Sequence, residues 1–125
     1  MRLLFIPIFL LILVISRPAA SQNLKPSNKS EEKVIQMIKT LPEIVADNKY
    51  MTKRGRPYII YIENTAGDLD NYYHVAVSED NGSKLVPHFR FLVKAKTYQI
   101  YYVDFWNDNF KPIPLKVWRK RKISM

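Results

Sequence analysis

The 125-residue chain contains no cysteine and only three glycines. The missing thiols exclude disulfides, cysteine nucleophiles and cysteine-ligated metals, and they exclude a lipid anchor on an N-terminal cysteine. No glycine-rich loop that could cradle a phosphate occurs, and no G-x-S-x-G motif of a nucleophilic serine occurs. These absences remove the familiar signatures of enzymes, and we expect no cofactor.

Histidine is almost as scarce, with only His74 and His88. Neither has a carboxylate at a fixed short spacing, and the acidic pair Glu79-Asp80 is assigned to a turn. A zinc site without cysteine would need carboxylates as well as both histidines, so none is expected. Asp68 and Asp70 resemble part of a calcium loop, but the other ligands and their spacing are missing. We therefore predict no metal site and no catalytic residue.

The first residues are rich in apolar side chains. Leu3 to Ile15 form an almost unbroken apolar run, and small residues follow at Ala19-Ala20-Ser21. The run is shorter than the about 20 residues that span a bilayer, and it matches the apolar region of a secretory signal peptide. We predict that residues 1–21 are a signal peptide, that Gln22 is the mature N-terminus, and that the protein is periplasmic or secreted. Cleavage after Ala20 and an uncleaved membrane anchor are the alternatives.

The mature part predicted in this way has 104 residues, a length typical of one domain. Losing Arg2 and Arg17 leaves 18 basic against 11 acidic residues, a net charge of +7. Export argues against nucleic acid as the native partner, and the charge favours a protein or an anionic component of the cell envelope. Solubility alone is the other explanation of the charge. An exported chain without cysteine is more typical of a bacterium than of an animal secretory pathway.

Hydrophobic periodicity predicts a helix near the N-terminus of the mature part. Residues 22–29 are polar and aperiodic, which indicates a flexible leader. Ser30 is the expected N-cap of the helix. Pro42 ends this helix or begins another, and residues 43–49 fit a short continuation. The apolar face of the helix carries Val34, Ile35, Ile38 and Leu41.

After Pro57 the hydrophobic period changes from 3.6 to 2, which predicts antiparallel strands. Asn81-Gly82 is expected to form a hairpin turn because both residues tolerate positive φ, and Pro87 is expected at an edge or a bulge. The C-terminal segment is expected to be extended or to form a short helical turn. One helix on a four-stranded sheet gives a two-layer α+β domain over residues 30–125. The four strands are expected at residues 58–63, 72–79, 85–93 and 98–105.

The last of these strands has large apolar or aromatic residues on both faces. Tyr101, Val103 and Phe105 share the more apolar face, so we expect Tyr101 to point into the core and Tyr102 to point to solvent. One helix covers only one face of the sheet. The other is therefore expected to combine exposed tyrosines with cations, as recognition surfaces do. Tyrosines that simply pack across strands are the alternative explanation.

The candidate binding residues come from this surface and from the basic C-terminal tail. They are Tyr98, Tyr102, Arg90 and Lys94 on the hairpin, and Arg119, Lys120, Arg121 and Lys122 in the tail.

The segment "YYHVAVSEDNGSKLVPHFRFLVKAKTYQIYYVD", residues 72–104, follows a helix that ends at a proline. This order resembles the PepSY-type domains of bacterial exported proteins, in which a helix precedes antiparallel strands. The closing hairpin of that family reads roughly aromatic-x-Val-Asp-x-x-Thr-Gly-x-Ile. Lys94 and Tyr98 stand in place of its aspartate and glycine, whereas the matching positions are Phe91, Val93, Thr97 and Ile100.

The resemblance implies a cystatin-like arrangement and a non-enzymatic binding or inhibitory role in the cell envelope, sometimes toward peptidases. The segment "IPLKVWRK" is similar to the closing segment of small exported proteins of the Bacteroidetes, which implies no activity. We therefore expect an exported, non-enzymatic binding module. A polyanion or membrane-surface binder that uses the basic tail, and an enzyme with an unfamiliar site, stay as alternatives, and the oligomeric state is left open.

Overall fold

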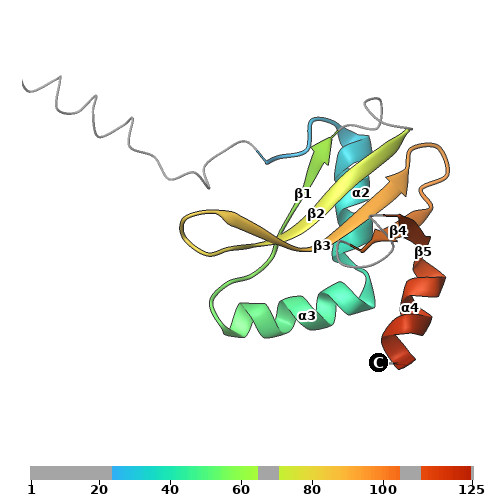
Figure 1. Cartoon of the computed structure of the whole chain (residues 1–125). Helices are drawn as coiled ribbons and strands as arrows, with labels where there is room; N and C mark the ends of the chain where they lie inside the picture. The colour runs from blue at the N-terminus through green and yellow to red at the C-terminus, as the bar shows by residue number, and fades with distance from the viewer. Residues whose placement is uncertain (1–23, 65–70, 105–110, 125) are drawn as a thin grey trace, which may run out of the picture.

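The computed structural model describes residues 24–64, 71–104 and 111–124 (Figure 1). The predicted signal peptide lies outside the described residues. Two helices come first, and five strands and a third helix follow. They are α2 (Lys29–Lys39), α3 (Pro42–Lys53), β1 (Ile59–Asn64), β2 (Tyr72–Asp80), β3 (Leu85–Lys94), β4 (Ile100–Val103), β5 (Pro112–Pro114) and α4 (Leu115–Ser124).

The α+β class and the antiparallel sheet are confirmed, but the expected single helix and four strands are not. Pro42 takes the first helical position of α3, where its fixed φ favours a helix and its missing amide proton costs nothing. At the other end, Pro112–Pro114 forms the edge strand β5, a position that tolerates proline. The basic C-terminal segment then continues as the ten-residue helix α4.

The start of α2 differs from the sequence-based expectation by two residues. Asn28, not Ser30, is the N-cap, and its side-chain Oδ1 accepts a hydrogen bond of 2.9 Å from the Glu31 amide. The Glu31 carboxylate accepts in turn from the amide of Ser27 at 2.8 Å, and Glu31 is buried as a result. This reciprocal pair satisfies two amides at the helix start. It also orders the end of the segment that was predicted to be a flexible leader.

The strands pair in sequence order, β1-β2-β3-β4-β5, each antiparallel to the next. The predicted turn at Asn81-Gly82 joins β2 to β3, but only Gly82 has a positive φ there. Asn81 acts through its side chain, because Oδ1 accepts hydrogen bonds from the amides of Ser83 and Lys84. Pro87 was expected at an edge or a bulge, and it lies at a break in the β2–β3 register, which is a bulge.

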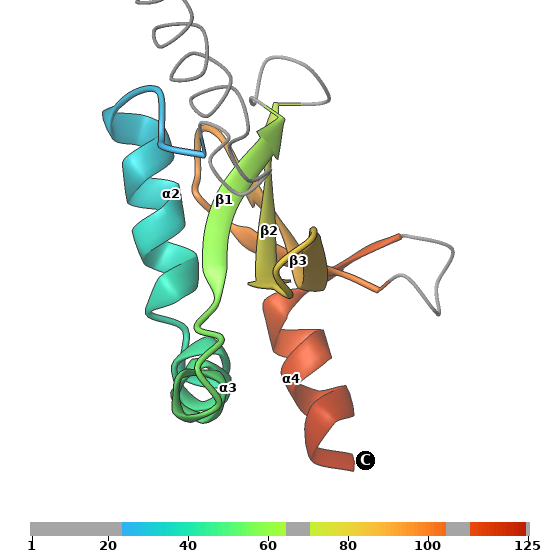
Figure 2. The ribbon, with the colours of Figure 1, turned by 90° about the vertical axis from the view of Figure 1, so that its left-hand side faces the viewer.

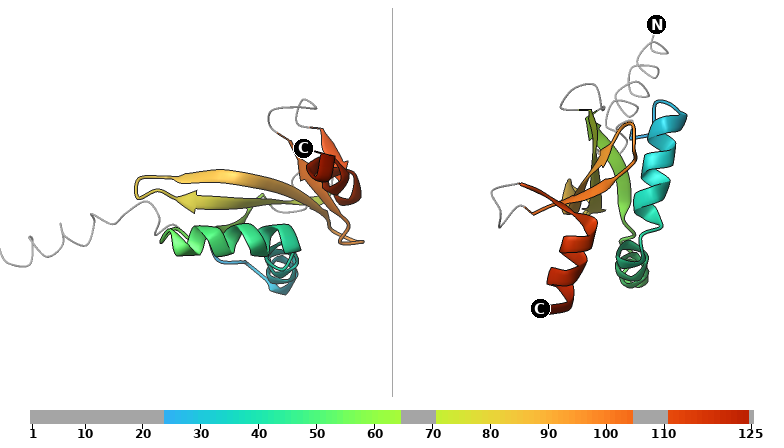
Figure 3. Two further views of the ribbon diagram at one scale, coloured as in Figure 1. Left: turned by 90° about the horizontal axis from the view of Figure 1, so that it is seen from below. Right: turned by 90° about the vertical axis from the view of Figure 1, so that its right-hand side faces the viewer.

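One face of the sheet, the covered face, carries the core. Directly paired residues share a face, so Val77 with Phe89, Val75 with Phe91, and Phe91 with Tyr102 all lie on it. In Figures 1 and 3, α2 and α3 lie on one side of the strands. The buried cluster joins these helices to the sheet. Its members are Val34, Ile38, Leu41, Ile44, Met51, Tyr58, Val75, Val77, Phe91, Val93, Ile113 and Trp118.

The helix α4 completes this core from below. Figures 1 and 2 show α3 and α4 next to each other under the lower end of the sheet. Trp118 of α4 is 7% exposed, and its ring contacts the rings of Phe89, Phe91 and Tyr102. Ile38 and Leu41 lie in the same cluster as Val75 and Phe91, as the helical pattern of α2 predicted.

Candidate functional site

The predicted binding residues are distributed over three parts of the molecule. Arg90 and Lys94 lie on β3 and face away from the core. Tyr98 and Tyr102 pack against the core cluster instead. The cations of the tail lie on α4. The structure therefore does not bring the eight predicted residues together into one site.

The prediction that Tyr101 points inward and Tyr102 outward is wrong. Tyr102 pairs with Phe91 and stacks on Trp118 with ring centroids 4.6 Å apart. Burial raises the pKa of the Tyr102 phenol, and the charge of Asp104 raises it further. Tyr101 pairs with Leu92 on the opposite face. The apolar count of each face misled the prediction because α4, which supplies Trp118, was not expected to be there.

Tyr98 lies in the turn between β3 and β4 with φ +58, a conformation that glycine adopts more easily. Its ring packs against the core cluster, and Nζ of Lys33 on α2 lies 4.0 Å from the ring centroid. This cation–π contact ties the turn to the helix. The Tyr98 side chain therefore makes its contacts inside the domain.

The basic residues of α4 are in different situations. The Arg119 guanidinium binds both carboxylate oxygens of Glu43, with Nε–Oε2 at 2.6 Å and Nη2–Oε1 at 3.2 Å. This bidentate pair links α4 to α3 and raises the pKa of Arg119. Lys120 and Arg121 are exposed, and the side chain of Lys122 lies outside the described residues. Arg119 therefore joins two helices rather than serving as part of a solvated tail.

The second face of the sheet, which we call the open face, is a candidate binding surface. In Figure 1 it is turned toward the viewer, and no helix of the described residues lies in front of β1, β2 and β3. Large half-buried side chains alternate there with small ones and with cations. The open face comprises Ile59, Tyr61, Glu63, Tyr72, His74, Ala76, Ser78, Arg90, Leu92, Lys94, Tyr101 and Val103.

Polar and aromatic contacts fix the side chains of the open face. Arg90 of β3 reaches across β2 to Glu63 of β1, with Nη2–Oε2 at 3.0 Å. The Tyr61 hydroxyl accepts a hydrogen bond of 3.2 Å from Ser78. The rings of Tyr72 and Tyr101 meet edge to face with centroids 5.8 Å apart. A surface ordered in this way loses little side-chain entropy when a partner binds.

A polar network, which we call the Tyr58 network, lies at the lower end of the covered face. The Tyr58 hydroxyl donates to the Asp47 carboxylate of α3 and lies 3.2 Å from Nδ1 of His88. Nε2 of His88 is 2.9 Å from Oε1 of Glu79, and Oε2 of Glu79 accepts from Arg56 at 2.8 Å. The network thus connects α3 with the starts of β1 and β3 and the end of β2.

The bulge at Pro87 explains how His88 reaches this network. Val77 pairs with Phe89 but its neighbour Ser78 pairs with Pro87, so His88 is the extra residue. Strict alternation would place the consecutive residues His88 and Phe89 on opposite faces. Both rings nevertheless contact the ring of Tyr58, at 5.3 and 6.2 Å between centroids. The bulge redirects the histidine, a known use of this irregularity.

The protonation states of the Tyr58 network favour a structural role. Burial raises the pKa of the Tyr58 phenol and the hydrogen bond to Asp47 raises it further, so this hydroxyl stays a donor. The hydrogen bond from Arg56, with a further one from His88, lowers the pKa of Glu79. Both groups hold a fixed charge state near neutral pH. Sequence reasoning missed the network because its members are 9 to 30 residues apart.

The described residues contain neither a cluster of metal ligands nor a helix that could span a membrane. No three carboxylate or imidazole side chains of that part of the chain gather closely enough to hold a metal ion. None of its helices has the length and apolar character needed to cross a bilayer. Comparison of the whole chain with family models, with curated proteins and with solved structures found no match in any of the three. The PepSY resemblance therefore rests on its quoted residues alone.

Proposed function

We propose that this chain is an exported, non-enzymatic binding module whose open face holds an acidic surface of a partner protein. The observation that supports this most strongly is the composition of the open face itself. Tyr61, Tyr72 and Tyr101 present large rings beside the cations Arg90 and Lys94, with no helix of the described residues above them. Tyrosine and arginine are enriched where proteins bind one another.

The charge of the chain supports an acidic partner. The full sequence carries a net charge of +9, and the part after the predicted signal peptide carries +7. A surface of this sign accelerates encounters with an acidic protein and disfavours basic ones. The half-buried tyrosines would then supply the apolar contact that holds the complex together after encounter.

The experiment uses residues 22–125 as bait for an envelope extract of the host, followed by purification of the captured protein. Its affinity for the bait is then measured by calorimetry at low and at high salt. We expect an acidic protein that binds wild type and binds the double variant Tyr72→Ser/Tyr101→Ser at least tenfold more weakly. Tyr50→Ser is the matched control, because Tyr50 is an exposed tyrosine that lies on α3 and not on the open face.

Equal affinity of the open-face variant and the Tyr50 control would overturn the proposal. A photo-crosslinker placed at Tyr72 should capture the partner, and one placed at Tyr50 should not. Thermal unfolding of each variant keeps a folding defect from being read as a binding defect.

A second candidate function, binding of an anionic polymer of the envelope, is favoured by one observation on α4. This helix carries five basic residues and no acidic one. Such binding weakens steeply with salt, because it depends on exposed charges. Capture of polyphosphate by wild type, and its loss in Lys120→Gln/Arg121→Gln with the open face intact, would favour this function over the first.

A further inference from the structure

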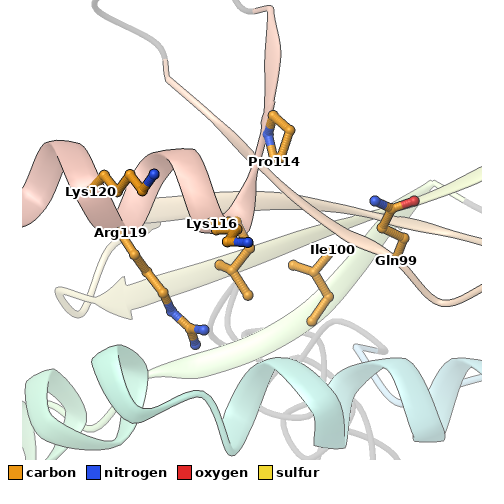
Figure 4. A pocket seen from close by; sticks show the side chains of 7 residues that line it. Gln99, Ile100, Pro114, Lys116, Arg119 and Lys120 are labelled. Atoms are coloured by element: carbon orange, nitrogen blue, oxygen red, sulfur yellow. The ribbon is translucent and has the colours of Figure 1, made fainter.

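A cavity of about 610 Å³ lies between the start of β4 and the first turns of α4. Figure 4 shows the side chains around it. Gln99 and Ile100 come from one side, and the residues of α4 come from the other. Its volume is in the range of pockets that hold small organic molecules.

The walls of this cavity are apolar. Ile100, Pro114 and Leu115 line it, and Ile100 and Leu115 also pack against the core cluster, so these walls are held in place from behind. Pro114 is fixed further by its pairing with Tyr101. An apolar group that entered the cavity would remove this surface from water, which favours binding.

The rim of the cavity is positively charged. Lys116, Arg119 and Lys120 follow one another at the spacing of one helix face, and all three line the cavity. Among the residues that the structure describes, no acidic one lines it. Glu43 already binds the Arg119 guanidinium from the α3 side. Lys116 and Lys120 add two further positive charges to this rim.

We propose that this cavity binds a small amphipathic anion, an acyl chain that ends in a carboxylate or an equivalent anionic head. The acyl chain would lie against Ile100, Pro114 and Leu115, and the head would lie between Lys116 and Lys120. The apolar walls disfavour a bare inorganic anion, and the positive rim disfavours an amphipathic cation. Pro114 pairs with Tyr101 of the open face, but the other lining residues are not members of that face. The inference therefore goes beyond the proposed function and does not depend on it.

In the first experiment, a protein of residues 22–125 is titrated with three probes. The two amphiphilic probes are kept below the concentrations at which they form micelles. Sodium decanoate carries both features, inorganic phosphate carries the charge alone, and decyltrimethylammonium carries the chain with the opposite charge. We expect decanoate alone to bind in calorimetry and to shift the amide resonances of Ile100 and Leu115. Equal binding of the cation, binding of phosphate alone, or no binding of decanoate would each overturn the proposal.

The second experiment tests the rim with variants. Lys116→Gln/Lys120→Gln should bind decanoate about tenfold more weakly than wild type, because two charge-assisted contacts to the head are lost. Lys49→Gln/Lys53→Gln, which removes two exposed lysines at the same spacing on α3, is the matched control and should bind like wild type. Unchanged affinity in the rim variant would contradict the assignment. If the double variant unfolds, the single change at the exposed Lys116 serves the same purpose.

A third comparison separates a free acyl anion from a lipid head group. Vesicles of neutral and of anionic phospholipid are offered to wild type and to the rim variant. We expect decanoate to compete with any binding to the anionic vesicles. Binding to vesicles without any binding of decanoate would place the cations of α4 at a membrane surface and would overturn the proposed cavity ligand.

Discussion

The covered face and the open face are made from alternate residues of the same strands, yet the described helices pack on the covered face alone. On the covered face Val75, Val77, Phe91 and Val93 are fully buried beneath α2 and α4. On the open face only the small residues Ala76 and Ser78 are fully buried. Their larger neighbours close over these small residues and keep part of their own surface in water.

The difference between the two faces shows that residue type alone does not determine how a side chain packs. Tyr101 and Tyr102 are the same amino acid at adjacent positions, and both are half-buried. The first meets Tyr72 on the open face, and the second stacks on Trp118 in the core. Position relative to α4, rather than residue type, decides which tyrosine supports the fold and which is presented to a partner.

The largest expected effect comes from removing the ring that closes the core. Trp118→Ala should lower the free energy of unfolding by about 3–5 kcal/mol, because three ring contacts are lost and a large cavity remains. Urea denaturation followed by circular dichroism measures this. A loss below about 1 kcal/mol would mean that α4 does not close the covered face.

The adjacent tyrosines test the comparison most directly. Tyr102→Ala should cost about 2 kcal/mol or more, as expected for a ring that packs into the core. Tyr101→Ala should cost about 1 kcal/mol, the worth of the ring pair with Tyr72. Urea denaturation of both variants gives the difference. Equal losses would remove the distinction between the two faces of β4.

A smaller effect is expected from the ion pair that joins α4 to α3. Glu43→Gln should lower the free energy of unfolding by about 1 kcal/mol, because the Arg119 side chain is partly exposed to solvent. Glu63→Gln is the matched control, because it breaks an ion pair with Arg90 that joins two strands of the open face rather than two helices. The loss in Glu43→Gln should shrink at high salt. A loss that does not depend on salt would mean that packing, rather than charge, makes this contact.

The smallest expected effect is a pH dependence from the Tyr58 network. The folded-state pKa of Glu79 is lowered, chiefly by the hydrogen bond from Arg56. Its contribution to stability is therefore present above the ordinary carboxyl pKa of about 4.3, and is lost as pH falls through the lower folded value. Thermal midpoints of wild type and Glu79→Gln between about pH 6 and pH 3 should converge toward the acid end. A constant gap between them would show that Glu79 does not act through its charge.

Several elements could be predicted because their signals are local. The apolar positions Val34 and Ile38 recur at helical spacing, and alternation marked β2 and β3 to within a residue at each end. Asn81-Gly82 predicted the hairpin, although the asparagine acts through its side chain. Pro87 predicted the bulge because a missing amide proton weakens the ladder wherever proline stands.

The candidate site was harder to predict, because its parts depend on contacts between distant segments. Arg90 and Lys94 were correctly placed on the face away from the core. Tyr98 and Tyr102 were expected on a recognition surface, and they pack against the core instead. Nothing within a few residues of His88 indicated that it would meet Tyr58 and Glu79.

By itself the sequence determined that this chain forms a helix followed by antiparallel strands, since residue spacing and turn residues act over a few positions. It also determined the positive charge and the absence of disulfides. Only the tertiary structure decided which face of β4 is buried, which cation of the tail binds Glu43, and where the cavity beside α4 lies. Each of these depends on α4 packing beneath strands that precede it in the chain, and the burial of Trp118 holds that helix in place.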